Sequence, residues 1–268
     1  MSPTIIVGAT GAGKTTALMR RYYEWVRGGA QTNQILVLTA GAKHSSGWRR
    51  GLQLESHGPI EAHSFFGFIQ RELQLFWAPV QHAIPELTPW VRPEFLNVEI
   101  AHHLMRGLLE PLAGEFAALR ASPARLSIQI ASNLATVGAS AGLSPGEISR
   151  RLAQADTKEK APLYDHVHGL MENLRETCLR AGLLDYSLSL HLFTGVLLHH
   201  PAYLDHLRGR YRYLLVDDLD ETVPAEHDFL ERLAEGMAGA AFAFNPDGGH
   251  AGFMGADPMA AWERFISG

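Results

Sequence analysis

The chain has almost no cysteine and no long apolar run, and these absences exclude several classes of protein. Cys178 is the single cysteine among 268 residues, which excludes an internal disulfide framework and a four-cysteine zinc or iron–sulfur site. No apolar run approaches the ~20 residues of a membrane span. The N-terminus also lacks a charged segment followed by an apolar one, so secretion is not expected. We therefore expect a cytoplasmic protein with no membrane partner.

Positive charge is also scarce, and it is unevenly distributed. The chain carries 23 Lys and Arg against 28 Asp and Glu, which gives a net charge of −5. Residues 1–75 hold a small positive excess, whereas residues 211–268 are strongly acidic. An acidic total does not favour nonspecific nucleic-acid binding. A local basic face in the first quarter can still attract phosphates, because they respond to nearby charge.

Both ends of the chain alternate between short apolar runs and helical segments. Runs such as TIIVG at 4–8 and QILVLTA at 34–40 are typical of buried strands, and a helical segment follows each. This alternation predicts an α/β fold with a parallel sheet. Between about Pro79 and Pro201 the period is helical and no convincing strand is found, which indicates a helical insertion. The predicted division is 1–78 and 186–268 for the two parts of the α/β domain, and 79–185 for the insertion.

A phosphate-binding loop follows the first apolar run. The segment GATGAGKT matches G-x-x-x-x-G-K-[ST] in full, with a strand before it and a helix after it. Backbone N–H groups of such a loop surround phosphates, the lysine reaches the β- and γ-phosphates, and the hydroxyl after it holds Mg²⁺. The alternative is a chance match in a glycine-rich turn. The predicted nucleotide-binding residues are Gly8, Ala9, Thr10, Gly11, Ala12, Gly13, Lys14, Thr15 and Thr16.

A second apolar run ends in acids, as in YLLVDDLDET at 213–222. Phosphate loops need a carboxylate at the end of a nearby strand to hold Mg²⁺, and Asp217 supplies this carboxylate. The predicted metal-binding residues are therefore Asp217 and Thr15, whose hydroxyl is the other ligand. A neighbouring carboxylate usually orients and deprotonates the attacking water, so Asp217 and Asp218 are the predicted catalytic residues. The alternative is a solvated acidic loop after a buried strand.

Six segments in a fixed order resemble the first motor domain of the UvrD/Rep-like superfamily I DNA helicases. GATGAGKTT resembles motif I, ILVLTAGAKHSSGWRR motif Ia, IEAHSFFGFIQREL the T-x-H-S-F motif and AGLLDYSLSLHLF the G-x-x-D-F-x-D-L stretch. YRYLLVDDLDETVPAEHDFLERL and AFNPDGGHAGFMGADP resemble motifs II and III. The resemblance covers nearly the whole chain. It implies a RecA-like P-loop NTPase sheet with a helical insertion subdomain similar to 1B, ATP and Mg²⁺ as cofactors, and action on single-stranded DNA in repair or recombination.

The resemblance also implies contacts with the backbone of single-stranded DNA. Hydroxyls, a lysine and an aromatic ring near strand ends can grip phosphates and stack a base. The plainer alternative is that these residues are capping hydroxyls and a core phenylalanine. The matched positions are Thr39, Lys43, His63, Ser64 and Phe65.

Several positions depart from the family pattern, and all of them weaken ATP hydrolysis. Asp218 stands where the family has glutamate, and a ~1 Å retreat of a base can cost ~10²-fold in rate. Asp220 and Gly248 stand where the family has glutamine, Met254 where it has arginine, and Asn245 where it has aspartate. Nucleotide binding is therefore better supported than hydrolysis.

Other interpretations remain open. The second motor domain has no counterpart before Gly268, so we expect a fragment or a half motor that uses a second RecA-like domain in cis or in trans. The alternative function is a catalytically degenerate helicase-like scaffold subunit of a DNA-processing nuclease complex. The long helical insertion and the VDDLDET block argue against a P-loop kinase. The histidine pairs lack the carboxylate or cysteine spacing of a metal site.

Overall fold

The chain folds into two compact units. The computed structural model describes residues 3–54, 58–85, 87, 91–112, 114, 122–132, 134, 138–155 and 161–267. The first unit comprises Met1–Arg71 and Leu198–Gly268, and the second comprises Glu72–Leu197. The ranges predicted from the sequence have their boundaries after residues 78 and 185, near this division but not coincident with it.

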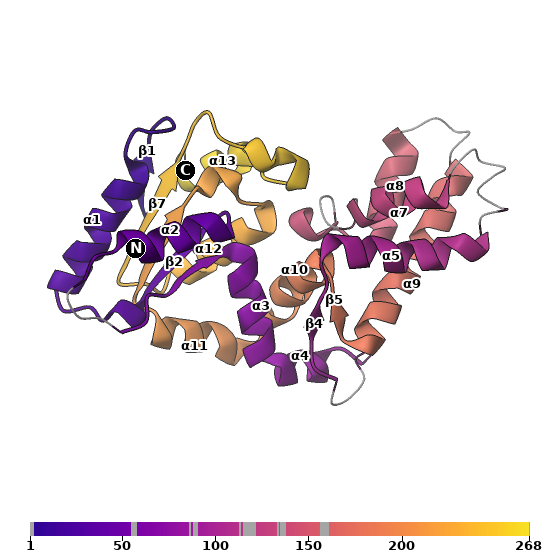
Figure 1. The fold of residues 1–268 in the computed structure, drawn as a ribbon, viewed down its shortest axis with the longest axis horizontal. Coiled ribbons are helices and arrows are strands. Elements are labelled where there is room, and N and C mark those ends of the chain that lie inside the picture. The colour runs from indigo at the N-terminus through magenta and orange to yellow at the C-terminus, as the bar shows by residue number, and fades with distance from the viewer. Residues whose placement is uncertain are drawn as a thin grey trace. The chain divides into compact units, whose positions relative to one another are not determined.

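The first unit contains a five-stranded sheet in which every neighbouring pair of strands is parallel (Figure 1). Its strands lie in the order β1-β7-β6-β2-β3. Helices or longer segments connect them, as a parallel sheet requires. This confirms the predicted α/β class. The strands are β1 (Thr4–Val7), β2 (Ile35–Thr39), β3 (Ala62–Ser64), β6 (Tyr213–Asp217) and β7 (Gly239–Phe244).

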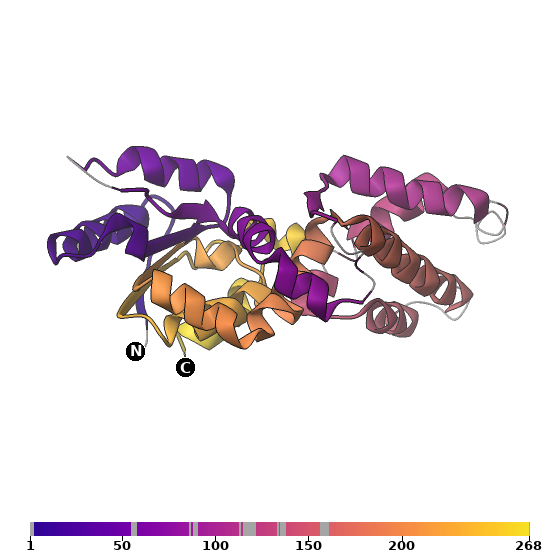
Figure 2. The same ribbon diagram turned by 90° about the horizontal axis from the view of Figure 1, so that it is seen from below.

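Helices cover both faces of this sheet because its central strands are apolar on both sides. All five residues of β2 are buried. α1 (Lys14–Arg27) and α2 (Ala42–Gly51) pack on one face, where Tyr22 and Trp48 belong to the same core cluster as alternate residues of the strands. On the opposite face, Phe242 and Phe244 of β7 contact aromatic rings of α13 (Pro258–Phe265). Figure 2 shows the sheet between these two layers.

The remaining helices of the first unit are about as long as α2. α3 (Phe65–Leu75) begins directly after β3 and contains the boundary between the units, α11 (Pro201–Arg210) precedes β6, and α12 (Pro224–Ala234) joins β6 to β7. Ser64 accepts a hydrogen bond from the backbone N of Gly67 (3.1 Å), so the predicted helix start at Ser64 is confirmed. The 3₁₀ turns are η1 (Thr32–Gln34), η5 (Leu197–His199), η6 (Leu219–Glu221) and η7 (His250–Met254).

The prediction that residues 4–8 form a buried strand is wrong in one respect. The strand exists as β1, but it lies at the edge of the sheet and pairs only with β7. Its residues are partly exposed, and Val7 is 46% exposed. An apolar run therefore does not distinguish an edge strand from a central one.

The second unit is mainly helical, as predicted. Ser144 accepts a hydrogen bond from the backbone N of Glu147 (3.2 Å) before α8 begins at Pro145, and Asp185 caps α10 through the backbone N of Leu188 (2.8 Å). The expectation of no strand is wrong, because β4 (Glu94–Phe95) and β5 (Leu183–Leu184) form a parallel pair. Two-residue strands are too short to leave a detectable period. The helical elements are α4 (Trp77–Ala83), α5 (Val98–Leu109), η2 (Glu110–Leu112), α7 (Pro123–Ser132), α8 (Pro145–Ala155), α9 (Ala161–Ala181) and α10 (Tyr186–Gly195).

The helices were also compared with the length and hydropathy that a bilayer span requires. Over the described part of the chain, none is both long and apolar enough to cross a membrane.

Candidate nucleotide-binding site

The phosphate loop lies between β1 and α1, as its sequence predicts. Gly11 and Gly13 have φ angles of 79° and 86°, a left-handed conformation that other L-residues adopt only at a cost. The Lys14 ammonium donates to the backbone carbonyls of Gly8 (2.7 Å) and Ala9 (3.0 Å). The loop therefore curls around its own lysine.

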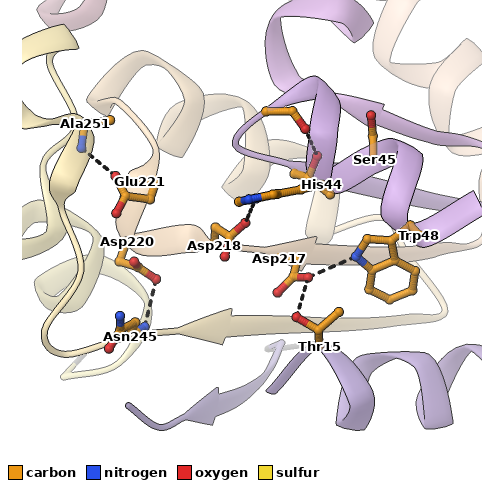
Figure 3. A network of polar contacts seen from close by, with 12 residues as sticks. Thr15, His44, Ser45, Trp48, Asp217, Asp218, Asp220, Glu221, Asn245 and Ala251 are labelled. Carbon is orange, nitrogen blue, oxygen red and sulfur yellow. Dashed lines mark hydrogen bonds and ion pairs between the residues drawn. The ribbon is translucent and has the colours of Figure 1, made fainter. Parts of the chain in front are cut away.

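The end of β6 meets the start of α1 at Asp217. The Thr15 hydroxyl donates to Asp217 Oδ2 at 2.8 Å, and the Trp48 indole donates to the same oxygen at 2.9 Å (Figure 3). Asp217 is 3% exposed, and its Oδ1 is buried with no hydrogen-bond partner among the described residues. A buried carboxylate oxygen without a partner is costly. A hydroxyl beside a carboxylate with a free oxygen is the donor set that Mg²⁺ prefers in phosphate-loop proteins, so the residues present fit this ion.

Asp218 is turned toward α2. It is the one residue other than glycine with a positive φ (65°) in the described chain, and its Oδ2 lies 2.5 Å from His44 Nδ1. Burial and the charge of Asp217 raise the pKa of Asp218, and the contact with His44 partly opposes this rise. The predicted water-activating carboxylate therefore already has a side-chain partner.

The two acids after Asp218 position the loop that follows β7. Asp220 accepts a hydrogen bond from the backbone N of Asn245 (2.8 Å). Glu221 accepts three, from the backbone N atoms of Gly249, His250 and Ala251 at 2.7–2.9 Å. Burial raises the pKa of Asp220, and the N–H of Asn245 opposes the rise. These acids thus fix the backbone between β7 and α13.

The phosphate loop, the start of α2 and the segments after β6 and β7 line an open cavity at the carboxyl ends of the strands. Its volume of about 800 Å³ is within the usual range for ligand sites. In the described part of the chain, Lys14 is the only Lys or Arg in its lining. Gly8, Ala9, Ala12 and Asp217 are not among the residues that line it. The lining consists of Thr10, Gly11, Gly13, Lys14, Thr15, Thr16, Ala40, Gly41, His44, Asp218, Asp220, Glu221, Asn245, His250 and Ala251.

The five positions matched to DNA contacts lie near the same edge of the sheet. Thr39 is opposite Asp217 in one strand pair and opposite Ser64 in the other, and its hydroxyl donates to the Gly41 carbonyl (3.0 Å). Thr39 is fully buried and Phe65 is 2% exposed. Lys43 is exposed on α2. In this conformation Lys43 is the one exposed residue of the set, and His63 and Ser64 are partly buried.

His63 belongs to a charged cluster around Glu61. Glu61 accepts hydrogen bonds from Arg71 (2.6 Å) and Arg210 (2.9 Å), and His63 Nε2 lies 3.0 Å from it. Burial alone would raise the pKa of Glu61, but the contacts with His63 and Arg71 and the charge of Arg210 lower it well below its usual range. The His63 ring is thus engaged within the protein.

The sequence did not single out two contributors to the site, His44 and Trp48. They lie one turn apart on α2, so their side chains share a face. They reach the acids because β2 pairs directly with β6. Strand order is not encoded in any local pattern, so only the spacing of the two residues could have drawn attention to them.

A comparison with known protein families identifies the chain. The model of the UvrD/REP helicase N-terminal domain matches residues 1–244, and no curated protein sequence gives a significant match. The match includes the phosphate loop, α2 and the acids after β6, and it ends at the last residue of β7. The parallel sheet and the phosphate loop of this family are those of an ATP-using helicase motor domain. The chain therefore belongs to the UvrD/REP helicase N-terminal domain family.

Proposed function

We propose that the chain is the ATP-binding N-terminal motor domain of a UvrD/Rep-like DNA helicase that acts on single-stranded DNA in repair or recombination. The observation that carries the proposal is the 2.8 Å contact between Thr15 and Asp217. It joins the phosphate loop to the acidic strand end, and a magnesium nucleotide needs both.

In this proposal, groups of the phosphate loop, of α1 and of the acidic strand end bind the nucleotide. Backbone N–H groups of the loop and the N-terminus of α1 receive the phosphates, and the Lys14 ammonium exchanges its backbone partners for phosphate oxygens. Thr15 and Asp217 would hold Mg²⁺, which would neutralise phosphate charge. Thr10 of the phosphate loop and Asn245 after β7, joined by a 3.1 Å hydrogen bond, also line the cavity.

Hydrolysis is weak in this proposal. Asp218, the shorter carboxylate at the water-activating position, is partnered by His44, and Gly248 and Met254 supply no polar side chain. A second RecA-like domain, in cis or in trans, completes the ATP site of such motors. DNA lies along the carboxyl ends of β2 and β3, with Lys43 as its exposed cation, and the contact is weak in the isolated chain.

A second candidate function is that of a helicase-like scaffold subunit of a DNA-processing nuclease complex. The observation that favours it is the engagement of three neighbouring acids in internal contacts. Asp218 contacts His44, Asp220 contacts the backbone of Asn245, and Glu221 holds the backbone of 249–251. Such a subunit binds nucleotide for structure or regulation and does not turn it over.

Titration with a fluorescent ATP analogue, with and without Mg²⁺, tests nucleotide binding. Lys14→Ala removes the ammonium from the cavity, and we expect affinity to fall roughly 10- to 100-fold, the value of a charge-assisted hydrogen bond. The matched control is Arg20→Ala, which removes a positive charge from an exposed position of the same helix outside the cavity. Equal binding by the parent and Lys14→Ala would refute the assignment.

A further inference from the structure

One face of α2 supplies a partner to each of the two neighbouring carboxylates at the end of β6. Trp48 donates to Asp217 and His44 contacts Asp218, one turn apart on the helix (Figure 3). The two partners differ in exposure, because Trp48 is 1% exposed while the His44 side chain is 57% exposed. Trp48 is therefore part of the core, and His44 is part of the cavity lining.

The contact with Asp218 leaves one nitrogen of His44 available. Nδ1 is committed to the carboxylate at 2.5 Å, which fixes the plane of the ring, and Nε2 has no partner among the described residues. Asp218 contributes to this arrangement from a left-handed backbone conformation with φ 65°. Such a conformation is unfavourable for most residues other than glycine, and where it persists it often marks a functional site.

The charges that line the cavity indicate what His44 Nε2 could bind. Lys14 is the only Lys or Arg in the described lining, which also contains Asp218, Asp220 and Glu221. The terminal phosphate of a nucleoside triphosphate adds negative charge beside these acids. A second cationic donor besides Lys14 would offset this charge, and histidine is the side chain in the described lining that can provide one.

Of the two histidines in the lining, His44 is the one whose ring is oriented. His250 contacts Glu221 through its backbone N (2.9 Å), so that contact does not fix its ring. His44 is held through its ring to the residue next to Asp217, and a Mg²⁺ ion held by Thr15 and Asp217 would neutralise charge on the outer phosphates of the nucleotide. Its place in the cavity is therefore beside the terminal phosphate.

We propose that His44 binds the terminal phosphate and makes the site prefer a nucleoside triphosphate over the diphosphate. The inference rests on the proposed function, in which the cavity binds a magnesium nucleotide. With protons on both nitrogens, the imidazolium donates Nδ1–H to Asp218 and Nε2–H to a phosphate oxygen. Each of these is a charge-assisted hydrogen bond.

The test compares the affinities for adenylyl imidodiphosphate and for ADP, both with Mg²⁺, by isothermal titration calorimetry. We expect the parent chain to bind the triphosphate analogue more tightly. His44→Ala should weaken binding of the analogue by about 10-fold and leave the affinity for ADP within about 2-fold. His44→Gln, which keeps an N–H donor, should recover part of the loss, and Ser46→Ala on the exposed surface of α2 should change neither affinity.

The possible results separate the two proposals. If the parent binds neither nucleotide, the proposed function is overturned and this inference with it. If the parent binds both and His44→Ala keeps the same ratio of affinities, only the inference is overturned. An equal loss for both nucleotides would also overturn it, because His44 would then support the fold of the site and not the terminal phosphate.

Discussion

The Asp220 carboxylate occupies the space that a side chain at residue 248 would need. A Cβ added to Gly248 would lie 1.9 Å from Asp220 Oδ2 and 2.9 Å from Asp220 Cβ. By the resemblance to helicases, these are two positions at which the family pattern has glutamine, and in the structure they are neighbours. Asp220 is buried and bonded to the backbone of Asn245, so it cannot turn away without losing a contact.

Gly248→Ala is expected to destabilise the chain by about 1–3 kcal/mol, the usual cost of overpacking. Urea denaturation measures it. Gly252→Ala is the matched control, because a Cβ there meets nothing within 4 Å. When Asp220 is also replaced by alanine, Gly248→Ala should lower the unfolding free energy by less. If the losses of unfolding free energy from the two substitutions are fully additive, the added Cβ does not clash with the Asp220 carboxylate.

We expect the isolated chain to hydrolyse ATP very slowly or not at all, with or without single-stranded DNA. The carboxylate of Asp218 is short and partnered by His44, and a motor of this kind closes its ATP site between two domains. Phosphate release measures turnover, with Lys14→Ala as the blank for contaminating ATPases. DNA-stimulated turnover of ~10 s⁻¹, the typical enzyme median, would contradict this expectation.

Binding of single-stranded DNA is expected to be weak, independent of sequence and only mildly sensitive to salt. Lys43 is the exposed cation of the positions matched to DNA contacts, so we expect few counterions to be released. Fluorescence anisotropy with a labelled oligothymidine at low salt measures it. Lys43→Ala should reduce affinity about 3-fold, as the loss of one exposed phosphate contact would.

The control for DNA binding is Arg27→Ala, which removes an exposed charge from the last turn of α1. Phe65→Ala is not a suitable probe, because Phe65 is buried and its truncation would alter core packing. No binding at any salt concentration would leave the scaffold function ahead of the motor function.

Stability should fall as the pH rises from 6.5 to 8 because of Glu226. Burial raises the pKa of Glu226 from 4.5 to about 8, and a hydrogen bond from the backbone N of Val223 only partly opposes this. Between these two pKa values the folded state binds a proton that the unfolded state has already released, so the unfolding free energy falls as the pH rises and stops falling above pH 8. Over this interval the loss is about 2 kcal/mol.

Glu226→Gln keeps the acceptor for Val223 and removes the titration. Its unfolding free energy should therefore vary less between pH 6.5 and 8 than that of the parent. The pKa of His227 is lowered by burial to about 4, so folded His227 stays neutral in both proteins, and its contribution cancels when the two pH profiles are compared. Identical pH profiles for the two proteins would show that Glu226 does not titrate in the folded chain.

The sequence predicted the local parts of the site because local chemistry determines them. Gly11 and Gly13 permit the left-handed turns of the loop, and the apolar run before Asp217 makes a buried strand that ends in acids. The resemblance to helicases, carried by the order of six motifs, agrees with the family match over residues 1–244. Where the pattern was short or the partner distant, prediction failed, as for β4 and β5 and for the edge position of β1.

The sequence by itself determined the phosphate loop, the acidic strand end, the parallel α/β class and the family, since each depends on residues that are close along the chain or on the order of motifs. Only the tertiary structure decided which strands are neighbours, and that choice brings α2 to the acids. His44 and Asp218 are 174 positions apart, and Trp48 and Asp217 are 169 apart. The burial of Phe65 and the contact of Gly248 with Asp220 arise in the same way. Such contacts depend on the packing of whole elements against the sheet, and no local propensity or period specifies them.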